Sequence, residues 1–402
     1  EECSNDTIVG VGDFARLGQS WSTPYLARIR TGDGALDFRD VVIFSGGYDL
    51  NQDEEDQSIR NVHDTVGNEV FIVDAFTGNL LWSAHDGGQL GSGLSNAKLL
   101  THSIPGGMRI LDMNQDGAID RMYFADMKGR VWRLELPTGP DYDLSASRLV
   151  KFANLGGVGK ENRMFFNEPD VAMLKSGGRS LLTISLGSGY RAHPANENAK
   201  DNFYVLLDSA VHTSLRRNFA NDGKFKTLKH RDLVKVTASG SSSAVSIDQG
   251  LMTDKTILDV EGKSGWYMTL PKGGEKVLSS SITSDGNVMF TSLVPDAGAA
   301  ADILDICSAP ITQGRFYSLN ILTAEAGSDL NGDGTISEHE IMKVVTANEI
   351  PGTPQQVFNK PSCVDGDCKQ LFDIRVGKGG KPAASYDTSM LESIFWTNPE
   401  RK

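Results

Sequence analysis

The segment VFIVDAFTGNLLW, residues 70–82, contains the pattern that decides the fold. Four apolar residues lead to Asp74, a short turn carries Gly78, and an apolar return ends in Trp82. An Asp side chain can accept hydrogen bonds from turn amides, and Gly adopts the positive φ that such turns need. The pattern therefore predicts an antiparallel hairpin whose Trp packs between sheets.

The same design returns in RMYFADMKGRVWRL, residues 121–134, with Asp126, Gly129 and Trp132 in the equivalent positions. Weaker copies are expected at residues 203–208 and 316–320, and a last strand pair at residues 371–376 and 394–396. About five such units recur along the chain, which predicts an all-β protein, a β-propeller of four-stranded blades. We assign core packing to every tryptophan. The longest helical pattern, residues 338–346, is short.

Composition narrows the function. The chain has 402 residues, and 39 Lys and Arg against 52 Asp and Glu give a net charge of −13. Such an acidic chain without a basic block argues against nucleic-acid binding, which needs clustered cations. No apolar run reaches the length of a transmembrane segment, and no signal peptide is visible, as would also hold for a mature secreted fragment. We expect one β-propeller domain over residues 1–402.

Four cysteines bear on the compartment. Cys363 and Cys368 flank the acidic turn at residues 364–367 and are spaced for a disulfide-closed hairpin, which favours an oxidising compartment. Two free thiols, or half of a zinc site, are the alternatives, but no further Cys or His ligands lie nearby. The pairing of Cys3 and Cys307 stays open.

The sharpest local motif is DLNGDGTISEHE, residues 329–340, an inserted EF-hand-like calcium loop. Calcium prefers six to eight oxygen ligands, which alternate side chains of a tight loop supply while Gly334 permits the bend. The expected ligands are the side chains of Asp329, Asn331, Asp333 and Ser337, the carbonyl of Thr335 and the carboxylate of Glu340. A solvated acidic turn is the alternative.

A second loop of this kind covers residues 112–120. Its expected ligands are Asp112, Asn114, Asp116, the carbonyl of Ala118, and Asp120. Tyr123 stands where the bidentate Glu would be, so Asp120 is expected to complete the shell; an Asx-turn-rich hairpin is the alternative. We expect strands before both loops, so that two Ca²⁺ ions would each hold a hairpin together. Residues 49–53 resemble the start of such a loop but lack its Gly, and we interpret them as a solvated acidic loop.

Catalytic motifs are missing from the sequence. It contains neither a Gly-x-Ser-x-Gly elbow nor a His-Glu-x-x-His helix. Residues 187–191 are Gly-rich but lack the Lys-Ser/Thr of a phosphate loop, and we interpret them as a tight turn. We therefore expect that the protein is not an enzyme.

Several ordered segments together resemble the C-terminal propeller of the type IV pilus tip adhesin family (PilC/PilY type). They are residues 18–24, 42–49, 70–82, 120–132, 168–172, 187–194, 202–204 and 265–271. The resemblance implies a calcium-binding protein at the pilus tip, on the surface of a Gram-negative bacterium, as part of a larger adhesin chain. It also implies minor pilins as partners and attachment to host cells or abiotic surfaces.

In the family, the loop matching Asp112 to Asp120 regulates pilus extension and retraction, and with it twitching motility; we carry that role to these positions. Two features depart from the family. Its propeller has seven blades, whereas this sequence shows about five units, so we expect a propeller that is either incomplete in this chain or completed by sequence outside it. An Arg-Gly-Asp motif, found in some members, is absent.

Two other functions remain open. The Asp, Thr-Gly and Trp turns also occur in quinoprotein dehydrogenase propellers, which typically have adjacent cysteines over the cofactor, and no two cysteines are adjacent here. Alternatively, a calcium-stapled propeller could bind a host glycan or protein without a pilus.

Overall fold

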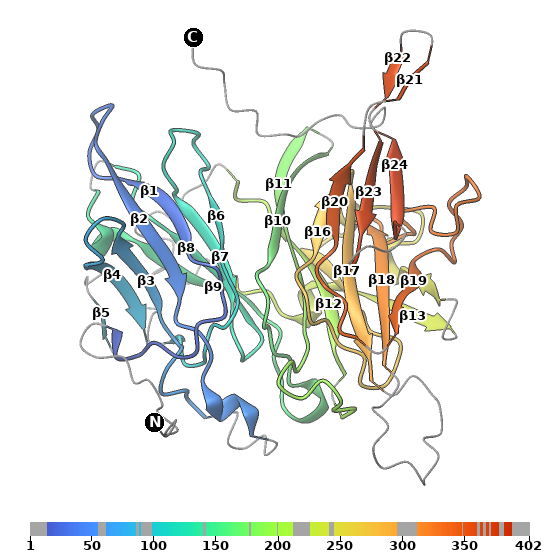
Figure 1. Ribbon diagram of the computed structural model, residues 1–402, viewed down its shortest axis with the longest axis horizontal. Coiled ribbons are helices and arrows are strands. Elements are labelled where there is room, and N and C mark those ends of the chain that lie inside the picture. The colour runs from blue at the N-terminus through green and yellow to red at the C-terminus, as the bar shows by residue number, and fades with distance from the viewer. Residues whose placement is uncertain are drawn as a thin grey trace, which may run out of the picture.

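The regular secondary structure of the described residues consists mainly of β-strands (Figure 1). The computed structural model describes residues 14–54, 62–85, 88–89, 99–139, 142–176, 178–198, 200–211, 226–240, 245–295, 312–347, 349–359, 362–364, 367–369, 371–377 and 382–387. Helical elements in these ranges are short 3-10 turns: η2 (Leu50–Asp53), η4 (Leu144–Ala146), η5 (Gly159–Glu161), η6 (His230–Asp232), η7 (Gly250–Met252) and η8 (Ile257–Asp259). None of the described helical turns has the length or apolar character to span a bilayer.

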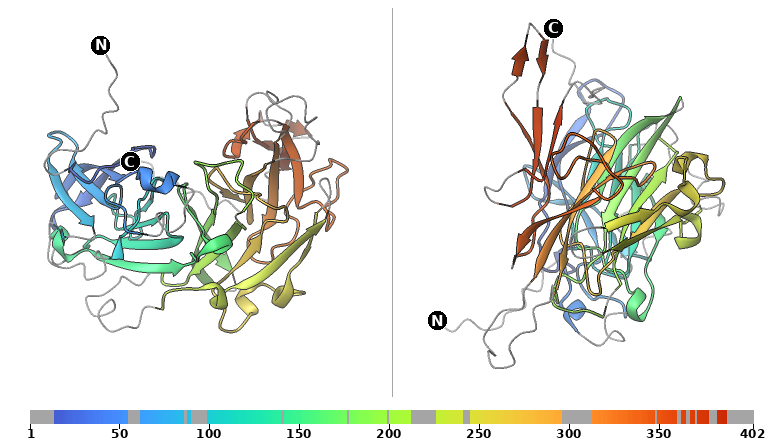
Figure 2. Two further views of the ribbon diagram at one scale, coloured as in Figure 1. Left: turned by 90° about the horizontal axis from the view of Figure 1, so that it is seen from below. Right: turned by 90° about the vertical axis from the view of Figure 1, so that its right-hand side faces the viewer.

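Five sheets of three or more strands follow one another in chain order, forming the arc seen in Figure 2 (left). The first has the order β1 (Tyr25–Arg30), β2 (Phe38–Ser45), β3 (Val70–Asp74), β4 (Leu80–His85) and β5 (Gly88–Gln89). The second contains β6 (Arg109–Leu111), β7 (Arg121–Ala125), β8 (Arg130–Glu135) and β9 (Arg148–Asn154).

The other three sheets contain the second half of the chain. The third has the order β10 (Asp170–Ser176), β11 (Arg179–Gly187), β12 (Asn202–Asp208), β15 (Gly265–Thr269), β13 (Val234–Gly240) and β14 (Val245–Asp248). The fourth contains β16 (Ile282–Ser284), β17 (Asn287–Val294), β18 (Gln313–Asn320) and β19 (Met342–Ala347). The fifth has the order β20 (Gln355–Phe358), β23 (Leu371–Arg375) and β24 (Ala384–Asp387).

The five units predicted from the sequence each fall in a different sheet, so the all-β, propeller-like architecture is confirmed. Among the described residues, the second and fourth sheets have the expected four strands, whereas the first has five, the third six and the fifth three. In the third sheet, β13 pairs parallel to β15 and adds two strands.

Three expectations for the last third of the chain differ from the structure or are not tested by it. The helical pattern at residues 338–346 is wrong: Met342 begins β19, whose apolar residues pair with β18. The partner expected at residues 394–396 lies outside the described residues, and β23 pairs instead with β20 and with β24. A separate hairpin, β21 (Ser362–Val364) and β22 (Asp367–Lys369), places Cys363 opposite Cys368; the disulfide stays a prediction.

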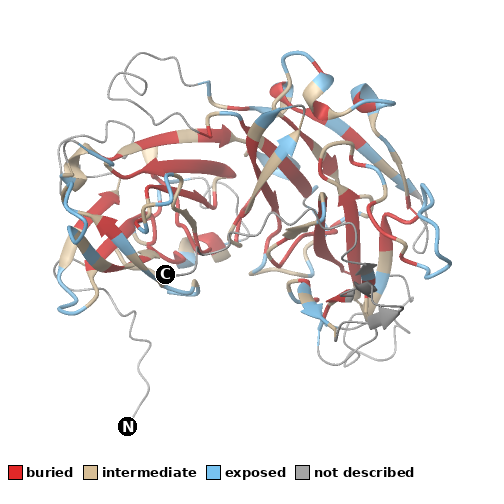
Figure 3. Ribbon diagram, turned by 90° about the horizontal axis from the view of Figure 1, so that it is seen from above, coloured by how far each residue is buried: buried red, intermediate tan, exposed pale blue. Residues whose placement is uncertain are grey.

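Four of the five core clusters among the described residues form layers, each between two successive sheets. The fifth gathers residues from connections between strands: Tyr48, Met127, Met164, Phe166 and Tyr190. Because successive residues of a strand point to opposite faces, one strand contributes to two layers. In β7, Phe124 packs between the first and second sheets, whereas Tyr123 packs between the second and third. In β12, Tyr204 packs toward the second sheet, whereas Phe203 packs toward the fourth. Because both faces of these strands are covered, most of their residues are buried, whereas many of the connections are exposed (Figure 3).

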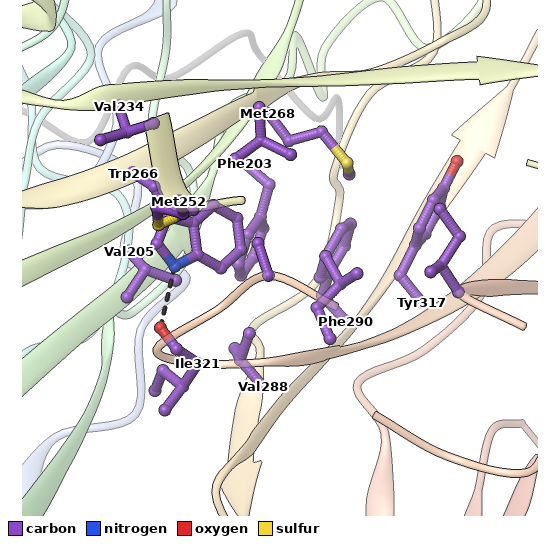
Figure 4. Close-up of a cluster of buried hydrophobic side chains, with 14 of the residues drawn as sticks. Phe203, Val205, Val234, Met252, Trp266, Met268, Val288, Phe290, Tyr317 and Ile321 are labelled. Carbon is purple, nitrogen blue, oxygen red and sulfur yellow. Dashed lines mark hydrogen bonds between the residues drawn. The ribbon is translucent and has the colours of Figure 1, made fainter. Parts of the chain in front are cut away.

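The layer between the third and fourth sheets shows how these sheets contact one another (Figure 4). Phe203 stacks on Phe290 with ring centroids 3.8 Å apart, and Phe290 stacks on Tyr317 at 4.8 Å. Trp266 is fully buried, and its Nε1 donates a hydrogen bond to the Ile321 carbonyl at 2.8 Å. The polar edge of this tryptophan is thus satisfied while its ring fills the layer.

The predicted Asp-Gly-Trp hairpins have the expected geometry. Gly78 has φ 71° and Gly129 has φ 73°, and both Trp82 and Trp132 are buried. Trp21 contradicts the expectation of core packing, since 50% of its surface is exposed. It lies on an aromatic surface at the end of the first sheet instead.

The two hairpin aspartates differ in burial. Asp74 accepts hydrogen bonds from the turn amides of Phe76 and Thr77 at 3.0 and 2.9 Å. Asp126 is fully buried and accepts from the Arg130 guanidinium at 2.7 Å and from the Trp132 indole at 2.8 Å. The second carboxylate therefore holds a buried cation and an indole in place.

We expect Asp126→Ala to lower the free energy of unfolding by about 3–5 kcal/mol, because removing one partner leaves the Arg130 charge buried and unpaired. Urea denaturation followed by tryptophan fluorescence measures this loss. Asp74→Ala is the matched control and should cost clearly less. Equal losses in the two variants would contradict the role assigned to Asp126.

Candidate calcium loops

Both candidate loops connect neighbouring antiparallel strands of one sheet. Residues 112–120 join β6 to β7, and residues 329–340 lie in the connection from β18 to β19. The expectation that strands precede both loops is thus confirmed. A loop in this position fixes the hairpin that it closes.

The two loops share one hydrogen-bond network. The first Asp accepts from the amide of the glycine five residues later, at 2.8 Å in the first loop and 2.7 Å in the second. The Asn two positions on accepts from the amide of the following Asp, at 3.0 and 2.7 Å. That Asp accepts from the amide two residues beyond it, at 2.9 Å in both loops. The side-chain oxygens are therefore drawn toward the inside of each bend.

Glycines permit these bends. Gly117 and Gly334, the sixth residues of the two loops, have the same φ of 88°. A side chain is strained at such an angle, which explains the residue type at both positions. The local backbone geometry is thus encoded separately in each loop.

The second loop gathers three acidic side chains. One oxygen each of Asp329, Asp333 and Glu340 lies within 4.8 Å of the others, and this is the one such acidic group found among the described residues. Hydrogen bonds from the Thr335 hydroxyl and amide lower the pKa of Asp333, so this carboxylate stays ionised near neutral pH. The loop therefore concentrates negative charge in one small volume.

Glu340 gives the strongest sign that a ligand belongs there. Its side chain is 7% exposed, and its Oε2 accepts from the Ser337 amide at 3.2 Å. Its Oε1 is buried without a hydrogen-bond partner. An unpaired buried carboxylate oxygen costs free energy, and a cation among the three acids would remove that cost.

The first loop balances its charge differently. Arg30 of β1 donates from Nε to Asp116 Oδ2 at 2.8 Å, so one candidate ligand oxygen already has a cationic partner. Burial raises the pKa of Asp116, but the bonds from Arg30 and the Ala118 amide outweigh it and the net pKa is lowered. Asp120 is buried, accepts from the Met113 amide, and has a pKa raised to about 6 by burial.

The donor sets of both loops suit a hard cation, because every candidate ligand is an oxygen. The residues of the second loop fit calcium better, since their acids converge and one oxygen is unpaired. The first loop has the same backbone network, but calcium there would compete with Arg30 for Asp116. Calcium binding at either loop stays a prediction.

Residues 49–53 have a structural explanation. Asp49 caps η2 by accepting from the Asn51 amide at 2.9 Å and also accepts from the amides of Thr65 and Val66. Asp53 accepts from the Tyr48 hydroxyl at 2.6 Å. These carboxylates hold the local chain together. The interpretation of residues 49–53 as a solvated acidic loop is therefore wrong for Asp49, which is buried against these amides.

Arg30 is the residue that the sequence did not reveal. It precedes Asp116 by 86 residues and belongs to another sheet. Nothing in the local pattern of either segment indicates the contact, because only the packing of the first sheet against the second brings them together. Its role in the first loop therefore depends on tertiary structure.

The fold and these loops define a class: an all-β protein of successive propeller-like sheets with calcium-type hairpin loops. No family model matches the chain. It is 23% identical over 375 residues to a type IV pilus biogenesis factor PilY1 homolog of Xylella fastidiosa (strain Temecula1 / ATCC 700964). The alignment covers 86% of this chain and 22% of that protein, so the chain spans less than a quarter of its relative's length.

The crystal structure of the Pseudomonas aeruginosa PilY1 C-terminal domain is similar, with a TM-score of 0.56 and 17% identity over 91% of this chain and 73% of that one. The chain has the fold of that domain, and the resemblance to the PilC/PilY type is confirmed. A europium-containing methanol dehydrogenase aligns over 90% of this chain and 52% of its own, at 12% identity and a TM-score of 0.32, too low to bear on fold or activity.

We expect Glu340→Gln to weaken calcium binding at the second loop by about tenfold or more, because ligand charge tunes the affinity of such loops. Isothermal titration of the metal-free protein should show two sites in the wild type and one unchanged site in the variant. Glu338→Gln is the matched control, since Glu338 is 84% exposed and outside the predicted ligand set. A single ion bound by the wild type would make one loop assignment wrong.

We expect Arg30→Gln to raise calcium affinity at the first loop by about two- to fivefold, because the guanidinium competes with the ion for Asp116 Oδ2 and a solvent-screened ion pair is weak. Calcium titrations are made in the Glu340→Gln background, in which the second loop is weakened, so that the first loop is measured by itself. Arg28→Gln removes the same charge from the same strand, but Arg28 pairs with Asp40 at 2.9 Å and should have a smaller effect. Identical affinities in both arginine variants would contradict competition at Asp116.

Proposed function

We propose that this chain is a calcium-binding module of a type IV pilus biogenesis factor. In this proposal it works on the surface of a Gram-negative bacterium, at the pilus tip, with minor pilins. Its PilY1-like fold and the name of its Xylella relative support the pilus context. The acidic cluster with the unpaired Glu340 oxygen supports calcium.

The proposed role of calcium is to make two sheets rigid. The first loop closes β6 and β7 in the second sheet, and the second loop closes β18 and β19 in the fourth. A cation that binds only the folded loop stabilises it in proportion to its occupancy. We propose that calcium occupancy thereby controls a pilin-binding surface, and through it pilus extension and retraction, twitching motility and surface attachment.

Capture of purified minor pilins by the immobilised chain tests this function. We expect capture in millimolar calcium, a loss on chelation, and a loss in Glu340→Gln that Glu338→Gln does not share. Capture that is equal with and without calcium would contradict calcium control. No capture under any condition would contradict the minor pilins as partners.

We also propose that the chain acts by binding and not by catalysis. A quinoprotein dehydrogenase would carry a quinone cofactor, and the sequence lacks the adjacent cysteines typical of that class. We expect the purified protein to show only the ultraviolet absorbance of its aromatic side chains. A quinone cofactor would add a band above about 300 nm, and we expect none. A bound chromophore that survives gel filtration would contradict this proposal.

A further inference from the structure

A cavity of about 300 Å³ lies where the first strands of four sheets begin. Four lining residues stand two positions before the first residue of β1, β6, β10 and β16, respectively: Thr23, Gly107, Glu168 and Ser280. Equivalent positions of successive sheets therefore meet at one place. Such convergence is the property of a propeller axis, where ligands find a concave site shared by several blades.

Contacts between these strands confirm that their beginnings are neighbours. The hydroxyl of Tyr25 in β1 donates to Glu168, just before β10. Arg109 of β6 places Nε 3.3 Å from Glu168 Oε1 and its NH2 group 3.6 Å from Asp170 Oδ1. The acidic charge of Glu168 is thus already matched by a cation.

An exposed aromatic surface forms one wall. Trp21 stacks on Tyr48 with centroids 4.7 Å apart and planes at 19°, and it stacks on Phe166 at 6.1 Å and 18°. Half of the Trp21 surface is exposed, although Trp82, Trp132 and Trp266 are buried. A tryptophan that is held in place by stacking and remains half exposed offers a flat apolar face to a ligand.

A cation contributes to the same cavity. Arg191 is exposed, and its NH1 group donates to the Leu278 carbonyl, which orients the guanidinium. Among the described residues no carboxylate lies within ion-pair distance of it. The backbone beside it is close-packed, because a Cβ on Gly189 would lie 2.4 Å from the Val277 carbonyl oxygen. Arg191 is thus held at the cavity with donors left for an anion.

We propose that this axial cavity binds a single sugar ring that carries a carboxylate, such as a uronic acid unit of a glycan. Trp21 would stack on the apolar C–H face of the ring, and Arg191 would pair with the carboxylate. Ser22, Thr23 and Ser280 also line the cavity, and their hydroxyl groups would be the partners of ring hydroxyls. A volume of about 300 Å³ lies at the lower end of ligand sites, which suits one ring.

Titration calorimetry with three probes tests this proposal on the whole purified chain. Methyl β-glucuronide carries both features, methyl β-glucoside has the ring without the carboxylate, and acetate has the carboxylate without the ring. We expect the glucuronide to bind at least tenfold more tightly than either of the other probes. If acetate binds as tightly as the glucuronide, the proposal of a sugar ligand is wrong. If the glucuronide does not bind at 10 mM, the proposed site is wrong.

Two variants assign the residues. Arg191→Gln should bring glucuronide affinity down to that of the glucoside, whereas Trp21→Ala should weaken both glycosides by at least fivefold. Phe76→Ala, at another exposed aromatic side chain, is the control and should leave both affinities unchanged. Thermal melting of each variant checks its fold. Wild-type glucuronide affinity in a folded Arg191→Gln variant would overturn the carboxylate contact.

Discussion

Burial of both faces of each sheet is the constraint on which the structure depends. A strand of a sheet that lies between two other sheets must present apolar side chains on both of its faces, and β7 and β12 do so by sending alternate apolar residues into different core layers. Each added sheet covers the face that the previous sheet leaves open. Removing packing from one layer therefore affects two sheets at once.

Two-sided burial forces charged residues of these strands into pairs. Arg133 of β8 is fully buried and donates to Asp208 of β12 at 2.7 Å, and the Tyr123 hydroxyl donates to the same carboxylate at 2.6 Å. In the fourth sheet Arg315 pairs with buried Glu275 at 3.1 Å. Because an unpaired buried charge is costly, such pairs restrict which segments can pack against one another.

The constraint is weaker at strand ends, and the candidate functional groups are found there. The two calcium-type loops lie in connections between strands, where the first carboxylate of each loop, that of Asp112 or Asp329, is partly exposed and organised by its own turn amides. The axial cavity lies where first strands begin, and its exposed Trp21 is free of the core layers. The packed sheets thus position polar groups that contribute little to the hydrophobic core themselves.

The sequence by itself determined the strands of the Asp-Gly-Trp hairpins and the bends of both calcium-type loops, because these depend on residues that are close neighbours in the chain. It could not give the parallel pairing of β13 with β15, or the strand at β19, where partners decide against local helical periodicity. It also missed the Arg30–Asp116 pair and the exposure of Trp21. Only tertiary structure decided these features, since each depends on contacts between segments that lie far apart in the chain.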